Sequence, residues 1–179
     1  ADARRGALNT NDLRGKVLRI NVKAGDIGGA DANKADLGSG TGAYTIPSGN
    51  LFPLAGGAQQ LKTRPEIYAM GFRNPFRFTV DPETGWVYLG QVGPDAGNDC
   101  FPANGGGCAT NPRGPRGYDT INQIREAANM GWPYCLAGQG YYEYDYATQT
   151  SGDQYDCDGG PTNDSTLNTG NVGGSVTGD

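Results

Sequence analysis

The stretch that decides the fold is Gly71-Phe72-Arg73-Asn74-Pro75-Phe76. A strand-like run, residues 66–70, leads into it, and a second run, residues 76–80, follows it. Asp81-Pro82-Glu83-Thr84-Gly85 then separates the second run from a third, residues 86–90. A Gly that can adopt positive φ between two alternating runs is typical of a β-hairpin. These residues therefore predict an antiparallel unit of short strands.

Core packing does not explain why Arg73 and Asn74 stand together between two strands, next to Pro75. We expect both polar groups to lie between strands, where burial without a partner costs about 1–3 kcal/mol each. A bound ligand is one partner that makes this placement favourable. For Arg73, the alternative is a salt bridge within the sheet.

The composition predicts a loop-rich all-β protein. Among 179 residues there are 31 Gly and 11 Pro, which favour turns and long loops over helices. Leu, Ile, Val and Phe together fall below the roughly 20% at which a self-sufficient core becomes doubtful. Short strands with tight turns suit a β-propeller built from antiparallel blade sheets, and a closed propeller needs about four or more blades. We therefore expect part of a propeller rather than a complete one.

Further strands are expected at residues 15–22 and 118–124. After Gly131-Trp132-Pro133 the sequence again indicates loop. We assign residues 1–157 to a partial propeller of about two blades with long loops. Residues 158–179, rich in Gly, Thr and Asn, are expected to form a loop or linker.

Charge and residue content exclude several classes of partner and site. The formal net charge is −5, whereas nucleic-acid affinity depends largely on Lys and Arg, so we expect no nucleic-acid partner. No apolar run approaches the roughly 20 residues that span a bilayer. The chain has no His, which removes the commonest general base and a common metal ligand.

The four cysteines form two local pairs in the sequence, Cys100 with Cys108 and Cys135 with Cys157. The absence of Cys-x-x-Cys spacing and of His argues against zinc. An even count in a Gly-rich chain predicts two disulfides and an oxidising compartment. Four buried free thiols in a cytosolic protein are the alternative.

An ordered set of short motifs resembles the glucose/sorbosone dehydrogenase family, quinoprotein sugar dehydrogenases that use pyrroloquinoline quinone (PQQ). The resemblance implies a six-bladed propeller with cofactor and sugar bound at its top face. It also implies that this chain is a middle segment of such a protein, similar to its secreted members. The motifs are Gly15-Lys16-Val17-Leu18-Arg19-Ile20, Ile46-Pro47-Ser48-Gly49-Asn50, Arg64-Pro65-Glu66-Ile67-Tyr68, Gly71-Phe72-Arg73-Asn74-Pro75, Gly93-Pro94, Ile121-Asn122 and Gly131-Trp132-Pro133.

By this resemblance, Arg73 and Asn74 contact the quinone, whose carboxylates and quinone oxygens suit a fork of N–H donors. The backbone carbonyls of Gly93 and Pro94 are the implied ligands of a calcium ion that polarises the quinone. An ordinary turn is the alternative reading of Gly93-Pro94.

The sequence departs from the family at two points. The family's catalytic base is a His in an earlier blade, and this chain has no His, so we expect no catalytic residue within it. Many members carry an acid where this chain has Thr120, in a site for a structural calcium, and Asp119 is the nearest substitute. By itself the segment is not expected to oxidise sugar.

Two functions follow as hypotheses. The first is a segment of a PQQ- and calcium-dependent sugar dehydrogenase, with its base and remaining blades outside this chain. The second is a non-catalytic secreted propeller module that binds carbohydrate or protein through Tyr141, Tyr142, Tyr144 and Tyr146, because aromatic faces stack on sugars. Both place the protein outside the cytoplasm, secreted or periplasmic.

Overall fold

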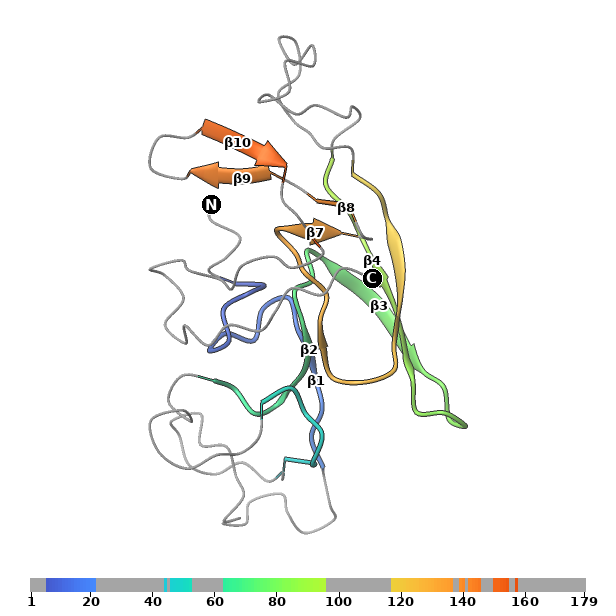
Figure 1. The fold of residues 1–179 in the computed structure, drawn as a ribbon. Helices are drawn as coiled ribbons and strands as arrows, with labels where there is room; N and C mark the ends of the chain where they lie inside the picture. The colour runs from blue at the N-terminus through green and yellow to red at the C-terminus, as the bar shows by residue number, and fades with distance from the viewer. Residues whose placement is uncertain are drawn as a thin grey trace.

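The computed structural model describes residues 6–21, 44, 46–52, 63–95, 117–136, 139–140, 142–145, 150–154 and 157. Within these residues the regular structure is entirely β, and no helix occurs (Figure 1). The predicted all-β class is therefore confirmed.

The strands are short and form two three-stranded and two two-stranded sheets in the described part of the chain. Their bounds are β1 Val17–Leu18, β2 Ile67–Met70, β3 Pro75–Val80, β4 Val87–Gln91, β5 Thr120–Ile124, β6 Ala128–Asn129, β7 Cys135–Leu136, β8 Gln139–Gly140, β9 Tyr142–Asp145 and β10 Thr150–Gln154.

One three-stranded sheet is an antiparallel meander in the order β3-β4-β5. Its central strand alternates, with Val87, Leu89 and Gln91 buried and Tyr88 and Gly90 half-buried. Residues that lie directly opposite one another share a face of the sheet, so Ile124, paired with Val87, joins the buried face. This sheet is the blade-like unit that the alternating runs predict.

The other three-stranded sheet has the order β1-β2-β6. Strand β1 pairs with β2 in the antiparallel sense, but β6 pairs with β2 in the parallel sense, which differs from the antiparallel sheets expected from the sequence. All four residues of β2 are buried. Tyr68 and Ala69 pack in one apolar cluster while Ile67 and Met70 pack in another, so β2 is covered on both faces.

The first of these clusters joins the two sheets. It brings Val17, Tyr68 and Ala69 of the β1-β2-β6 sheet together with Val87, Leu89 and Ile124 of the meander. Phe72, fully buried, lies in the same cluster. The chain between β2 and β3 is thereby anchored in the core one residue before Arg73.

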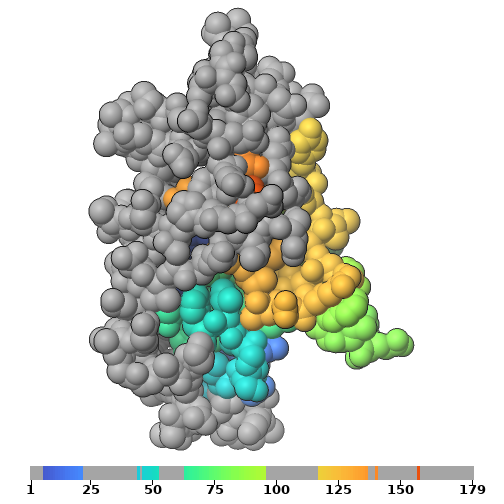
Figure 2. Space-filling model, in the orientation of Figure 1, coloured from blue at the N-terminus to red at the C-terminus, as the bar shows by residue number. Residues whose placement is uncertain are grey.

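The β3–β4 hairpin projects from the rest of the molecule (Figures 1 and 2). Asp81 closes its turn: the Asp81 N–H donates to the Trp86 carbonyl at 2.9 Å, and the Gly85 N–H donates to the Asp81 carbonyl at 2.8 Å. The Asp81 carboxylate accepts from the Glu83 N–H and the Thr84 hydroxyl. Gly85 adopts φ 73°, as the hairpin prediction requires.

Two expectations about elements are wrong. The chain beyond Gly131-Trp132-Pro133 is not simply loop, because it contains β7, β8, β9 and β10. The expectation of a Tyr-rich loop overlooks that Tyr and acidic residues alternate there with the period of a strand. Among the described residues 15–21, the strand is limited to Val17–Leu18, and its register with β2 shifts between these two residues.

Candidate functional site

Arg73 lies where three separate segments of the chain meet. Its backbone N–H donates to Gln91 Oε1 at 2.7 Å, and its Nη1 donates to the Val92 carbonyl at 3.2 Å. The guanidinium carbon lies 5.9 Å from the ring centroid of Trp132, within range of a cation–π contact. The side chain is half-buried. The structure therefore brings Arg73 and the Gly131-Trp132-Pro133 motif together.

Backbone geometry turns the chain at this point. Gly71 has φ 79°, and a side chain there would collide with Asn129 Oδ1 and the Gly131 N–H. The Gly71 carbonyl accepts the Trp132 N–H at 2.9 Å. Gly71 thus permits the close approach that places Trp132 beside Arg73.

Asn74 differs from expectation. Its side chain is exposed rather than buried between strands, although its carbonyl accepts the Val92 N–H at 3.0 Å. The difference arises because β3 begins at Pro75, an edge position of the sheet, so residue 74 faces solvent. The free-energy cost of burying a polar group without a partner therefore applies to the half-buried Arg73, whereas the exposed Asn74 side chain is hydrated.

Gly93 and Pro94 lie against the segment that leads into β5. The Gly93 N–H donates to Asp119 Oδ1 at 2.9 Å. A side chain at Gly93 would collide with the Tyr118 backbone, and one at Gly117 would collide with the Pro94 carbonyl. The two backbone segments are therefore in direct contact.

Asp119 and Thr120 have separate roles. Asp119, which is exposed, binds the Gly93 N–H rather than the Gly131-Trp132-Pro133 motif. Thr120 Oγ1 accepts from Gln91 Nε2 and from Asn122 Nδ2, each at 3.2 Å. Where many family members have a charged acid, this chain thus has a neutral acceptor for two amides.

Gln91 is the site residue that sequence reasoning missed. It is only 2% exposed, and it connects the Arg73 backbone with Thr120. A signal was present, because Val87, Leu89 and Gln91 occupy successive inward positions of one strand and the third is polar. A buried amide at such a position has to be hydrogen-bonded.

The donors at Arg73 fit an anionic, oxygen-rich ligand. Among the described residues, its side chain contacts only the Val92 carbonyl and the Trp132 ring, which leaves the Nε–H and Nη2–H groups to bind an anion. The oxygens near Gly93 are hard donors of the kind that calcium accepts: backbone carbonyls and the Asp119 carboxylate. No group of three or more acidic, His or Cys side chains that could hold a metal occurs in the described ranges.

Several other motif residues stabilise the fold instead. Asn50 Nδ2 donates to the carbonyls of Arg19 and Pro65, and Arg19 Nε donates to Asn50 Oδ1 at 2.8 Å. The Arg19 guanidinium carbon lies 4.4 Å from the centroid of the Tyr68 ring. These contacts connect three motifs that are distant in sequence and need no ligand to explain them.

Glu66 is a buried acidic residue that hydrogen-bonds to Tyr44. It is 2% exposed, and its Oε1 accepts the Tyr44 hydroxyl at 2.7 Å. Burial, together with this hydrogen bond, raises the pKa of Tyr44 to about 12. Tyr44 therefore remains a neutral donor near neutral pH.

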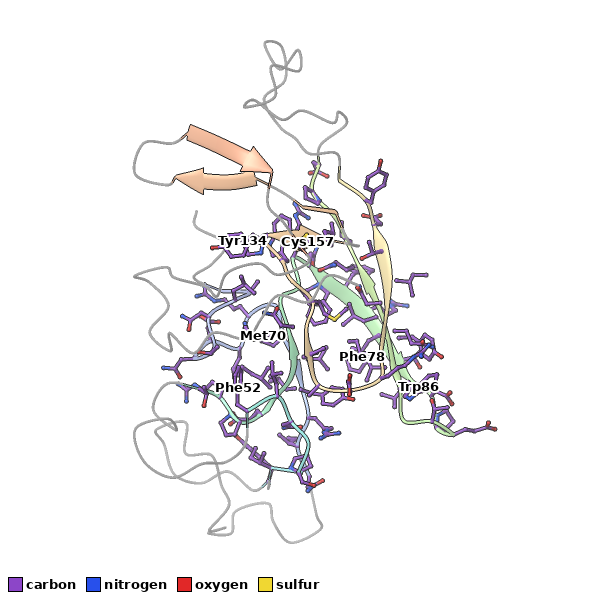
Figure 3. All side chains as sticks on the ribbon, in the orientation of Figure 1. Phe52, Met70, Phe78, Trp86, Tyr134 and Cys157 are labelled. Carbon is purple, nitrogen blue, oxygen red and sulfur yellow. A yellow bond between two sulfur atoms is a disulfide. The ribbon has the colours of Figure 1, made fainter. Side chains whose placement is uncertain are left out.

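Cys135 and Cys157, the second expected pair, form a disulfide with Cα atoms 6.0 Å apart. Both are buried against Tyr134, which Figure 3 labels beside Cys157. Cys100, Cys108, Tyr141 and Tyr146 lie outside the described residues. In the portion that the structure describes, no helix is long and apolar enough to cross a membrane.

Comparison with known proteins gives a family match, and the similar proteins include two plant relatives. The family model described as Glucose / Sorbosone dehydrogenase matches residues 40–158. The HIPL2 protein of Arabidopsis thaliana is 35% identical over 133 residues, which is 74% of this chain and 15% of that protein. The HIPL1 protein of the same plant is 28% identical over 134 residues, again 74% of this chain and 15% of the relative. The chain thus spans about a seventh of the length of these relatives. No solved structure matches.

Proposed function

Because the chain belongs to the glucose/sorbosone dehydrogenase family, we propose that it supplies part of the quinone-binding face of a sugar dehydrogenase-like propeller. The proposed cofactors are PQQ and calcium, and the proposed substrate is a sugar. The remaining blades of the same protein would complete the site. The Cys135–Cys157 disulfide supports a secreted or periplasmic location.

The observation that carries this proposal is the geometry of Arg73. Its guanidinium is half-buried and held between the Val92 carbonyl and the Trp132 ring, with N–H groups left for an anion. Arg presents planar, paired donors that match a carboxylate, which PQQ carries. Asn74, exposed beside it, can offer an amide to the same ligand.

Calcium would be held by the backbone carbonyls of Gly93 and Pro94. Asp119 lies next to them through its hydrogen bond with the Gly93 N–H, and its carboxylate supplies the negative charge that a divalent cation needs. Held there, PQQ would supply the hydride acceptor for oxidation of the sugar, and calcium would supply Lewis-acid polarisation. The family's base is a His, and because this chain contains none, the base would be supplied by the remaining blades.

Titration of the full-length apo protein with PQQ, with and without calcium, tests the proposal. We expect Arg73→Ala to weaken binding at least tenfold, since charge-assisted hydrogen bonds are worth about 1.5–3 kcal/mol each. Arg77→Ala is the matched control, because Arg77 is exposed on β3 and should leave affinity unchanged. Calcium chelation should weaken binding by the wild type. Equal affinity of the Arg73 and Arg77 variants, or no binding by the wild type, would refute the proposal.

The second candidate is a non-catalytic module that binds carbohydrate or protein. Its support is the absence of His from the sequence and the Tyr-rich segment that contains β9. Glycan binding that persists in the Arg73→Ala variant, without any quinone binding by the wild type, would favour this function.

A further inference from the structure

Gln91 connects the segment that carries Arg73 to the far edge of the meander sheet. It is the last residue of β4, and it lies opposite Pro75 on one side and Thr120 on the other. Its Oε1 accepts the Arg73 N–H, and its Nε2 donates to Thr120 Oγ1. With 2% of its surface exposed, this amide has no access to solvent that could replace either partner.

The Arg73 N–H depends on this side chain because no strand ladder serves it. Strand β3 starts only at Pro75, and the preceding Phe72 N–H is directed to the Gly15 carbonyl at 3.3 Å. Without Gln91, the partly buried Arg73 N–H would lack an acceptor, and an unsatisfied donor costs up to about 1–3 kcal/mol when it is shielded from water. The chain would relieve that cost by rotating residue 73 toward water.

Thr120 fixes the amide in turn. Its Oγ1 accepts from both Gln91 and Asn122, so the Gln91 side chain is held at both ends. The amide orientation is set by these partners, since Oε1 faces an N–H donor while Nε2 faces an oxygen. A rotation of Arg73 would therefore disturb a network that reaches from β4 into β5.

We infer that Gln91 is a positioning residue, which sets the presentation of the Arg73 guanidinium by binding its backbone N–H. This inference rests on the proposed quinone site. Gln91 itself need not contact the ligand. Partners of this kind, one step removed from a ligand-binding group, commonly change affinity by about 10–100-fold when they are removed.

Two substitutions at this position separate positioning from stability. Gln91→Leu has similar volume but no acceptor, so it should weaken PQQ binding to the full-length protein about tenfold. Gln91→Glu retains an acceptor for the Arg73 N–H, and the Thr120 hydroxyl can turn to donate to it. We expect Gln91→Glu to recover most of the affinity, although its buried charge should lower the thermal midpoint.

Control variants complete the experiment. Gln123→Leu removes an amide from the exposed face of β5, where it donates to the Tyr88 hydroxyl, and should leave affinity unchanged. Thr120→Val removes the hydroxyl that accepts from Gln91 and from Asn122 without touching Arg73, and should weaken binding about threefold. If Gln91→Leu does not fold, Thr120→Val still tests the network.

The outcomes distinguish the inference from the proposed function. If the wild type does not bind PQQ, the proposed function fails and the inference fails with it. If Arg73→Ala loses binding while Gln91→Leu or Thr120→Val binds as tightly as Gln123→Leu, only the inference is overturned. PQQ affinity could instead fall in proportion to the thermal midpoint across all variants, with Gln91→Glu binding most weakly. That result would show that Gln91 acts only on stability, and it would also overturn the inference.

Discussion

Lys16 is a buried cation whose ammonium group has no carboxylate partner among the described residues. Its Nζ donates to the carbonyls of Gly6, Ala7 and Arg14 at 2.7, 2.7 and 2.9 Å. Burial lowers the pKa of Lys16 to about 7 from its ordinary value of 10.5. Between these two values the unfolded chain holds more protons than the native one, so stability should rise with pH across this window.

The matched variant is Lys16→Met, which keeps the apolar stem and removes the titrating group. In the full-length protein, we expect the unfolding free energy of the wild type to rise relative to this variant by about 1 kcal/mol per unit between pH 7 and 9. Urea unfolding at pH 6, 7.5 and 9 measures the difference. Below pH 7 the two curves should run parallel, and parallel curves over the whole range would contradict the depressed pKa.

The sequence predicts Arg73 as a site residue but does not show which contacts position it. The Arg-Asn pair beside Pro75 was visible because neither side chain suits a core. Gln91 and Val92 were not singled out, because their contacts with Arg73 depend on the register of β3 against β4. Sequence spacing alone does not specify which acceptor a backbone N–H outside a ladder will find.

At the scale of elements, the β3-β4-β5 meander was predictable and the strands around it were not. Its alternating runs and the Asp81–Gly85 turn follow local rules of period and turn chemistry. Strand β6 has only two residues and pairs in parallel with β2, so it has no local signal. Strands this short are stabilised by tertiary contacts, and these contacts cannot be predicted from the local sequence.

Two glycines with positive φ allow the cost of backbone conformation to be separated from the cost of close packing. Gly85 has φ 73° and no atom near the position of an added Cβ, whereas Gly71 has φ 79° and is packed against Asn129 and Gly131. We expect Gly85→Ala to destabilise the full-length protein by about 1 kcal/mol, and Gly71→Ala to cost at least twice as much. Denaturant unfolding of both variants measures this, and equal effects would mean that the packing at Gly71 yields easily.

At the scale of the whole molecule, the meander leaves apolar surface uncovered. Phe78 and Val80 lie opposite the buried Leu89 and Val87, on the same face of the sheet, yet Phe78 is 59% exposed. Figure 3 shows Phe78 on the projecting hairpin. The hydrophobic core therefore covers β4 but not β3. Strand β3 lies at the edge of the sheet, and its face with Phe78 and Val80 is available for further packing.

We expect the 179-residue chain, studied by itself, to self-associate through this face. Phe78→Lys should shift the population toward monomer, because it places a charge where a partner would pack. Thr79→Lys is the control, since residue 79 points to the opposite face of the same strand. Sedimentation velocity over a range of concentrations measures both. A monomer at every concentration, or equal effects of the two variants, would contradict this expectation.

We propose that Arg73 is presented as a ligand-binding group beside a calcium site. A crystal structure of the full-length protein with PQQ and calcium tests this most directly. We expect quinone or carboxylate oxygens within hydrogen-bonding distance of the Arg73 guanidinium, and calcium about 2.3–2.6 Å from the carbonyl oxygens of Gly93 and Pro94. A quinone bound elsewhere, with Arg73 contacting only Val92 and Trp132, would contradict it.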